Sequence, residues 1–130
     1  MKTIAIALVI VGSLVVVTGS ASARTKKFPT QITIQGEQET SSNQTLIDGY
    51  VDSPKARCLS NRTVGIFAKD STGATGLLDV ARTGLGGGWA GRTEQFSGAV
   101  SIIAHVDRKR FGRKGHRKIC RAAEDEFFLP

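Results

Sequence analysis

The sequence contains few aromatic residues, few prolines and no repeating pattern. Aromatic residues make up 6% of its 130 residues, with one tryptophan and one tyrosine, and there are only three prolines. Fifteen glycines without a period exclude a collagen-like chain, and a hydrophobic content of 40% excludes a disordered one. The absence of a heptad pattern of apolar residues excludes a coiled coil. The composition therefore indicates a globular protein, and the length is enough for a single domain.

Long apolar runs are absent except near the N-terminus. Lys2 precedes about 14 apolar or small residues at 4–17, and Ala21-Ser22-Ala23 follows soon after. A positive start, a short apolar stretch and an Ala-x-Ala site are the parts of a secretory signal peptide. A membrane anchor would need roughly 20 apolar residues to cross the bilayer core. The sequence therefore predicts a signal peptide at 1–23, an extracellular location and no transmembrane segment in the mature chain.

Histidine is also scarce, which limits general acid–base chemistry. His105 and His116 are the only two, and neither belongs to a recognisable nucleophile motif such as G-x-S-x-G. Four aspartates are scattered over expected strands and turns: Asp48, Asp52, Asp70 and Asp79. Their spacing neither shows nor dismisses a pair of catalytic carboxylates. We therefore expect no catalytic residue, no metal and no cofactor, and a secreted hydrolase is the least favoured interpretation.

There are only two cysteines, Cys58 and Cys120. An exported chain enters an oxidising compartment, in which a disulfide forms and persists. A zinc site is not supported, because there is no C-x-x-C motif and two more ligands would be needed. The sequence therefore predicts a structural disulfide that closes a loop of about 62 residues and returns the C-terminal segment to the middle of the chain.

Short stretches of alternating apolar and polar residues predict β-strands. We expect about seven, near 31–35, 45–53, 62–69, 77–82, 89–95, 99–106 and 119–123, with a polar loop at 36–44 and a tail at 124–130. The clearest alternation should place Val100, Ile102, Ala104 and Val106 on the core face of their strand. No apolar pattern of helical period extends over three turns. These features predict an all-β, antiparallel Greek-key β-sandwich at 31–130, Ig-like or transthyretin-like, preceded by a flexible arm at 24–30.

Positive charge is concentrated in one segment. Eight of the 14 residues at 108–121 are basic, whereas the rest of the mature chain has nine basic and 11 acidic residues. A basic loop at 108–118 suits an anionic polysaccharide, a nucleic acid or an envelope surface, because binding releases counterions. Phe111 would stack on a base or a sugar. The candidate site consists of Arg108, Lys109, Arg110, Phe111, Arg113, Lys114, Arg117 and Lys118.

The same segment has an alternative interpretation, in which its charge has no binding role. Charge runs are usually solvated, and the acidic residues at 124–126 are close enough in sequence to neutralise part of this one. The main expectation is a secreted, monomeric, non-enzymatic module that binds an anionic polymer. The alternative is a structural or accessory module whose charge serves only solubility.

Two further motifs have simple explanations. The segment Gly86–Gly91 matches G-x-G-x-x-G, but no helix is expected to open there and orient a pyrophosphate. We expect a flexible turn that places Trp89 in the core, in preference to an exposed tryptophan that stacks on sugars. Asn43 and Asn61 begin formal N-glycosylation sequons, which matter only in a eukaryotic source.

Several short motifs, taken together, resemble a known kind of domain. They are Gly49-Tyr-Val-Asp-Ser, Cys58, Arg62-Thr-Val-Gly-Ile-Phe, Gly88-Trp89, the strand 99–106 and Cys120-Arg-Ala-Ala. The pattern, over roughly 32–123, resembles small secreted bacterial domains, common in actinobacteria, of the transthyretin-like or carboxypeptidase-regulatory-like type. The resemblance implies a β-sandwich with a disulfide from the start of a middle strand to the final strand, and it implies no known reaction. The chain departs from the usual form in its glycine-rich turn at 84–88 and in its basic segment.

Overall fold

The computed structural model describes residues 25–40, 43–94 and 98–130. The predicted signal peptide at 1–23 lies outside the described residues. The described chain is built of ten β-strands and one short 3-10 turn, η2, so the prediction of an all-β protein is confirmed. The elements are β1 (Lys26–Phe28), β2 (Gln31–Glu39), β3 (Gln44–Asp52), η2 (Ala56–Cys58), β4 (Thr63–Asp70), β5 (Thr75–Arg82), β6 (Gly88–Glu94), β7 (Ala99–Val106), β8 (Lys109–Phe111), β9 (Lys118–Cys120) and β10 (Ala123–Phe128).

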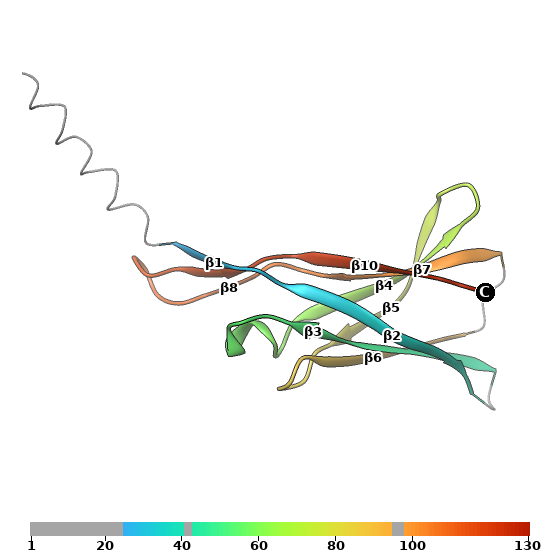
Figure 1. Ribbon diagram of the computed structural model, residues 1–130, viewed down its shortest axis with the longest axis horizontal. Helices are drawn as coiled ribbons and strands as arrows, with labels where there is room; N and C mark the ends of the chain where they lie inside the picture. Colours follow the sequence, from blue (N-terminus) through green and yellow to red (C-terminus); the bar gives the residue numbers. More distant parts are fainter. Residues whose placement is uncertain (1–24, 41–42, 95–97) are drawn as a thin grey trace, which may run out of the picture.

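Two antiparallel sheets lie face to face and form a sandwich (Figure 1). One sheet has the strand order β10-β7-β4-β5, and the other has the order β2-β3-β6. A third sheet, of order β1-β9-β8, extends from one end of the sandwich, at the opposite end of the molecule from the C-terminus (Figure 1). The sandwich agrees with the predicted fold class, although the structure has more strands than the expected seven. The Greek-key connectivity stays a prediction.

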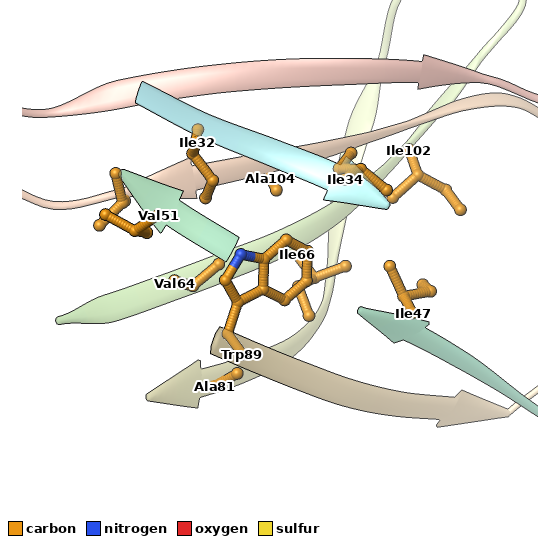
Figure 2. Close-up of a cluster of buried hydrophobic side chains, with 11 residues drawn as sticks. Ile32, Ile34, Ile47, Val51, Val64, Ile66, Ala81, Trp89, Ile102 and Ala104 are labelled. Atoms are coloured by element: carbon orange, nitrogen blue, oxygen red, sulfur yellow. The ribbon is translucent and has the colours of Figure 1, made fainter. Parts of the chain in front are cut away.

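The core lies between the two larger sheets. Along β2, β3 and β6 buried residues alternate with more exposed ones, as a half-buried sheet requires. The cluster consists of Ile32, Ile34, Ile47, Val51, Val64, Ile66, Ala81, Trp89, Ile102, Ala104 and Val106. Figure 2 shows Trp89 projecting from β6 into this cluster, and it is only 4% exposed. The prediction that Trp89 is a core residue is therefore confirmed.

Gly49 of β3 lies where the backbone of the neighbouring strand and the indole approach most closely. A Cβ atom at this position would overlap the carbonyl oxygen of Thr33 and lie 2.6 Å from Cζ2 of Trp89. The Thr33 oxygen belongs to the backbone, so it cannot swing aside as a flexible side chain would. Glycine is therefore required here by packing.

We expect Gly49→Ala to lower the free energy of unfolding by about 2 kcal/mol, the usual cost of overpacking a core. Gly76→Ala is the matched control, because Gly76 has open space around it. That variant should stay within about 0.5 kcal/mol of the parent protein. Urea denaturation of the three proteins measures the difference. Equal stability of the two variants would contradict this account of the core.

A carboxylate joins the two larger sheets along each of their open edges. On one side Asp125 of β10 accepts a hydrogen bond of 2.9 Å from the backbone N–H of Ile34 in β2. On the other side Asp79 of β5 accepts one of 2.9 Å from the N–H of Arg92 in β6. Each bond satisfies an edge donor that would otherwise be free to pair with another strand. Asp79 and Asp125 therefore have a structural role that the sequence did not reveal.

Several segments expected to lack regular structure form strands, including residues 109–111 of the predicted basic loop at 108–118, which form β8. Residues 26–28, within the predicted flexible arm, form β1 and pair with β9. The predicted strand at 119–123 is interrupted after Cys120, and residue 123 and most of the predicted tail at 124–130 form β10, which pairs with β7. β2 also continues to Glu39, into the predicted loop at 36–44. These strands form because the edge of a neighbouring strand offers unpaired backbone groups. That edge is formed by distant residues, so the local sequence pattern does not predict the pairing.

At the start of β7 the prediction of which residues face the core is wrong, because Ser101 and not Val100 is buried there. Val100 is 39% exposed and Ser101 is fully buried, whereas Ile102, Ala104 and Val106 are buried as expected. The pairing of β7 with β4 shifts register at Lys69 and Asp70, which reverses the faces at this end. Burial of Ser101 is tolerated because its hydroxyl donates a hydrogen bond of 2.6 Å to Glu126.

Candidate anionic-polymer site

The three-stranded sheet of β1, β9 and β8, called the basic sheet below, is the far end of one long hairpin. Val106 pairs with Ala123, and after a gap Lys109 pairs with Cys120 in the same register. The ladder is interrupted at residues 107–108 on one strand and 121–122 on the other. β1 joins as the third strand, parallel to β9. The hairpin therefore carries the basic segment away from the sandwich, and the gap separates the two parts.

Arg62, which precedes β4, fills this gap. Its side chain is 1% exposed, and its Nη2 atom donates hydrogen bonds of 2.8 Å to the carbonyl oxygens of Asp107 and Arg121, one on each side of the gap. Its Nη1 atom donates to the carbonyl oxygen of Cys58 at 2.7 Å. Burial lowers the pKa of the Arg62 guanidinium, and the carboxylate of Asp107 opposes this shift. One buried cation thus replaces the ladder bonds that the hairpin lacks.

The inner face of the basic sheet is covered by the segment around η2. Cys58 and Cys120 form the predicted disulfide, with a Cα–Cα distance of 5.4 Å, so that prediction is confirmed. Lys55 lies over the ring of Phe28, with Nζ 5.7 Å from its centroid. Cross-strand neighbours share a face, so Phe28 and Lys109, which both neighbour Cys120, lie on this inner face. This face is therefore occupied by the protein itself.

Three predicted site residues belong to that inner face. The ammonium group of Lys109 donates hydrogen bonds of 2.9 Å to the carbonyl oxygens of Arg57 and Ser60. Burial lowers the pKa of Lys109, and the charges of Arg57 and Arg62 act in the same direction. The ring of Phe111 has the Arg57 guanidinium 4.5 Å and the Lys118 ammonium 6.0 Å from its centroid. Lys109 and Phe111 therefore hold the sheet against the segment around η2, and Lys118 lies beside Phe111 on the same face.

The outer face of the basic sheet carries cations that are not engaged in this way. Lys27 and Arg110 flank Ile119 in the strand pairing, so the three side chains share the outer face. A surface hollow of about 300 Å³, called the outer hollow, is lined by Lys27, Arg108, Ile119, Arg121 and Ala122. It lies at the gap in the ladder. Lys27, Arg108, Arg110 and Arg121 are all exposed.

A second hollow lies at the turn of the hairpin. This tip hollow has a volume of about 290 Å³ and is lined by Gly112, Arg113, His116 and Lys118. Gly112 and Gly115 have φ angles of 96° and 83°, which favour glycine and let the chain reverse. Arg113, Lys114 and Arg117 are exposed around this turn. The predicted candidate residues are therefore divided among the inner face, the outer face and the tip.

Among the described residues, no acidic side chain forms an ion pair with the cations of the outer face or the tip. Within residues 25–40, 43–94 and 98–130, Lys69 forms an ion pair with Glu126, and His105 contacts the carboxylates of both Asp107 and Glu124. The His105 nitrogens are 3.3 Å and 3.4 Å from these two carboxylates. Asp107 and Glu124 thus face His105, Glu126 faces Lys69, and Asp125 accepts its hydrogen bond from the N–H of Ile34. The suggested neutralisation by residues 124–126 does not occur as direct ion pairs in the described chain.

Lys27 is a functional candidate that the sequence did not indicate, Arg121 was counted as basic but left out of the candidate site, and the structural contact of Arg57 with Phe111 was not expected. Lys27 reaches the outer face only because β1 pairs with β9, with hydrogen bonds of 3.0 Å from Lys26 N to Arg117 O and from Arg121 N to Phe28 O. Arg57 reaches Phe111 because the disulfide holds η2 over the sheet. The local sequence pattern does not predict such contacts, because they join segments that are distant in the chain.

Other sequence motifs have ordinary structural explanations. Asp70 accepts hydrogen bonds from Thr72 and Ala74 within a turn, and Asp79 joins two sheets. Asn43 and Asn61 are both exposed, with φ angles of 65° and 55°. The glycine-rich segment at 86–91 forms a turn and the start of β6. Among the described residues there is no cluster of three or more potential metal ligands, and no helix there is long and apolar enough to cross a membrane.

Comparisons with known proteins find little similarity. No protein-family profile matches the sequence, and no curated protein matches it. One similar solved structure is described as "Crystal structure of tetra-tandem repeat in extending region of large adhesion protein", with a sequence identity of 17% and a TM-score of 0.40. The match covers 77% of this chain and 24% of that chain, so this chain spans about a quarter of the length of that structure. A similarity this weak says nothing about function.

Proposed function

We propose that this protein is a secreted, monomeric, non-enzymatic module that binds an anionic polymer or the cell envelope through the basic sheet. The observation that carries the proposal is the set of exposed cations on the outer face and at the tip, which have no acidic partner among the described residues. Unpaired cations gathered on one projecting sheet raise the local concentration of a polyanion and gain free energy by releasing its counterions.

Secretion and the resemblance to transthyretin-like domains are part of this proposal. The disulfide supports an oxidising compartment, in which such bonds persist. The antiparallel sandwich is compatible with the resemblance, whereas the disulfide joins η2 to β9 and does not reach the final strand, β10. A binding role needs no catalytic group, so it fits the sparse supply of histidines.

The test replaces four exposed arginines, Arg108, Arg110, Arg113 and Arg117, by serine. Removal of each cation that binds the polymer should lower the slope of log affinity against log salt by about 0.9. When the salt concentration falls from about 200 to about 50 mM, the affinity of the parent protein for the polymer should rise. The affinity of the fourfold variant should rise by a factor that is about 100 times smaller. Binding to heparin and to duplex DNA, titrated over this range with the mature protein, measures the slope.

Arg82→Ser with Arg92→Ser is the control, because both residues are exposed cations of the sandwich. This pair should leave the slope for either polymer unchanged. If the parent protein binds neither polymer, or if the fourfold variant binds as well as the parent, the positive charge serves only solubility and the proposed function is wrong.

A further inference from the structure

We propose that the outer hollow is a binding site for one acidic unit of a polysaccharide, a sugar that carries a sulfate or a carboxylate. This inference rests on the proposed function and names its ligand class and its contact residues. It separates the outer hollow from the tip hollow and from the inner face, which the sequence groups together.

The lining of the outer hollow combines two kinds of surface. Arg108, Arg121 and Lys27 supply positive charge, and Ile119 and Ala122 supply an apolar patch among them. A guanidinium binds a sulfate or carboxylate through two parallel hydrogen bonds, so it recognises the shape of the anion as well as its charge. The apolar patch suits the C–H face of a sugar ring, which has no charge to satisfy. An acidic sugar unit presents both features on one small residue.

The backbone around the outer hollow is held in place before any ligand arrives. The buried guanidinium of Arg62 bonds the carbonyl oxygens of Asp107 and Arg121, which lie directly beside the hollow. On the other side, the pairing of β1 with β9 fixes the position of Lys27. A site built on fixed backbone loses less entropy on binding than one built on a free loop.

The aromatic residues of the basic end argue against a single-stranded nucleic acid. Proteins that bind single strands stack the bases on free aromatic faces. Phe28 lies beneath Lys55, and Phe111 lies beneath Arg57 and near Lys118. Within the described residues, no aromatic side chain of the basic sheet belongs to its outer face, because Phe28 and Phe111 both lie in the inner rows.

The tip hollow lacks the features that make the outer hollow selective. Its lining contains Gly112, Arg113, His116 and Lys118, with no aliphatic side chain. Its backbone is a glycine turn at the end of a projecting hairpin, away from the bonds of Arg62. The tip therefore adds long-range attraction for a polyanion but no surface for a sugar ring.

The experiment compares two triple variants that remove the same number of charges. One carries Lys27→Ser, Arg108→Ser and Arg121→Ser in the outer hollow, and the other carries Arg113→Ser, Lys114→Ser and Arg117→Ser at the tip. The probe is a heparin oligosaccharide at about 200 mM salt, where long-range attraction is screened. The outer variant should lose at least tenfold more affinity than the tip variant. Duplex and single-stranded DNA of the same number of charges are the comparison probes.

Ile119→Thr tests the apolar patch without changing the charge. We expect it to weaken binding of the oligosaccharide by about fourfold, the equivalent of one buried methylene group, and to leave binding of DNA unchanged. Circular dichroism and a thermal melt check that each variant keeps its fold.

The outcomes separate this inference from the proposed function. Equal losses in the two triple variants indicate a diffuse field of charge, which overturns the site but leaves polyanion binding intact. Tighter binding of either DNA probe than of the oligosaccharide, with no effect of Ile119→Thr, assigns the surface to a nucleic acid and overturns the inference. Unchanged binding in both triple variants overturns the proposed function as well.

Discussion

Arg62→Met is expected to lower the free energy of unfolding by about 3 kcal/mol, one of the two largest effects in this protein. The side chain is almost fully buried and bonds three backbone carbonyl oxygens, those of Cys58, Asp107 and Arg121. Removal leaves these acceptors without a partner, at a cost of roughly 1–3 kcal/mol for each one that stays buried. The gain from no longer burying a charge offsets part of that loss. Chemical denaturation of the mature protein measures the difference.

Arg62→Lys is the informative control for this prediction. Lysine keeps the charge and most of the aliphatic stem, but a single ammonium does not match the forked geometry of a guanidinium. We expect it to recover less than half of the lost stability. An ordinary substitution changes the free energy of unfolding by about 1 kcal/mol. If Arg62→Met costs no more than that, the result would falsify the assignment of Arg62 as the link across the gap.

Removal of the disulfide is the second large effect. The bond between Cys58 and Cys120 closes a loop with a sequence separation of 62. The chain-entropy model gives a stabilisation of about 4 kcal/mol for a loop of this length. Since a typical domain is stable by roughly 5–15 kcal/mol in total, Cys58→Ala with Cys120→Ala should leave a marginally stable protein. The denaturation midpoint of the double variant gives this value.

Reduction of the parent protein provides the control. Parent protein in excess reductant should unfold at nearly the same denaturant concentration as the double alanine variant, because both lack the cross-link. If the double variant keeps the stability of the oxidised parent, the packing of η2 on the basic sheet holds this end together without the bond. That result would contradict the predicted role of the disulfide.

Both predictions concern the same end of the molecule, where stability and the proposed binding site depend on shared elements. Arg62 holds the gap beside the outer hollow, and the disulfide holds η2 over the inner face. We therefore expect either variant to weaken polyanion binding as well as stability. A binding assay well below the denaturation midpoint distinguishes a loosened site from an unfolded protein.

The regular strands of the sandwich could be predicted because their patterns are local. β3 alternates buried Thr45, Ile47, Gly49 and Val51 with less buried residues, and the sequence shows that alternation directly. β1 and β10 were not predicted, since a three-residue strand and an acidic strand carry no such pattern. β10 forms by pairing with β7, and its Asp125 carboxylate accepts a hydrogen bond from the N–H of Ile34, a residue separated from it by 91 positions.

The candidate site shows the same division. The sequence places Arg108, Lys109, Arg110 and Phe111 in one basic segment, and the structure sends them to different faces because side chains alternate along a strand. Lys109 and Phe111 turn inward to η2, while Arg110 turns outward. Lys27 joins the outer face from a part of the chain about 90 residues away.

The amino-acid sequence by itself determined the all-β class, the disulfide, the buried Trp89 and the concentration of charge at 108–121. Each of these follows from composition or from a short repeating pattern, which a single chain displays without its partners. Only the tertiary structure decided which cations are free, because a lysine or arginine is engaged or exposed according to the backbone and rings that other segments bring to it. Arg62 is the clearest case, since its sequence neighbours give no sign of the three carbonyl groups that it joins.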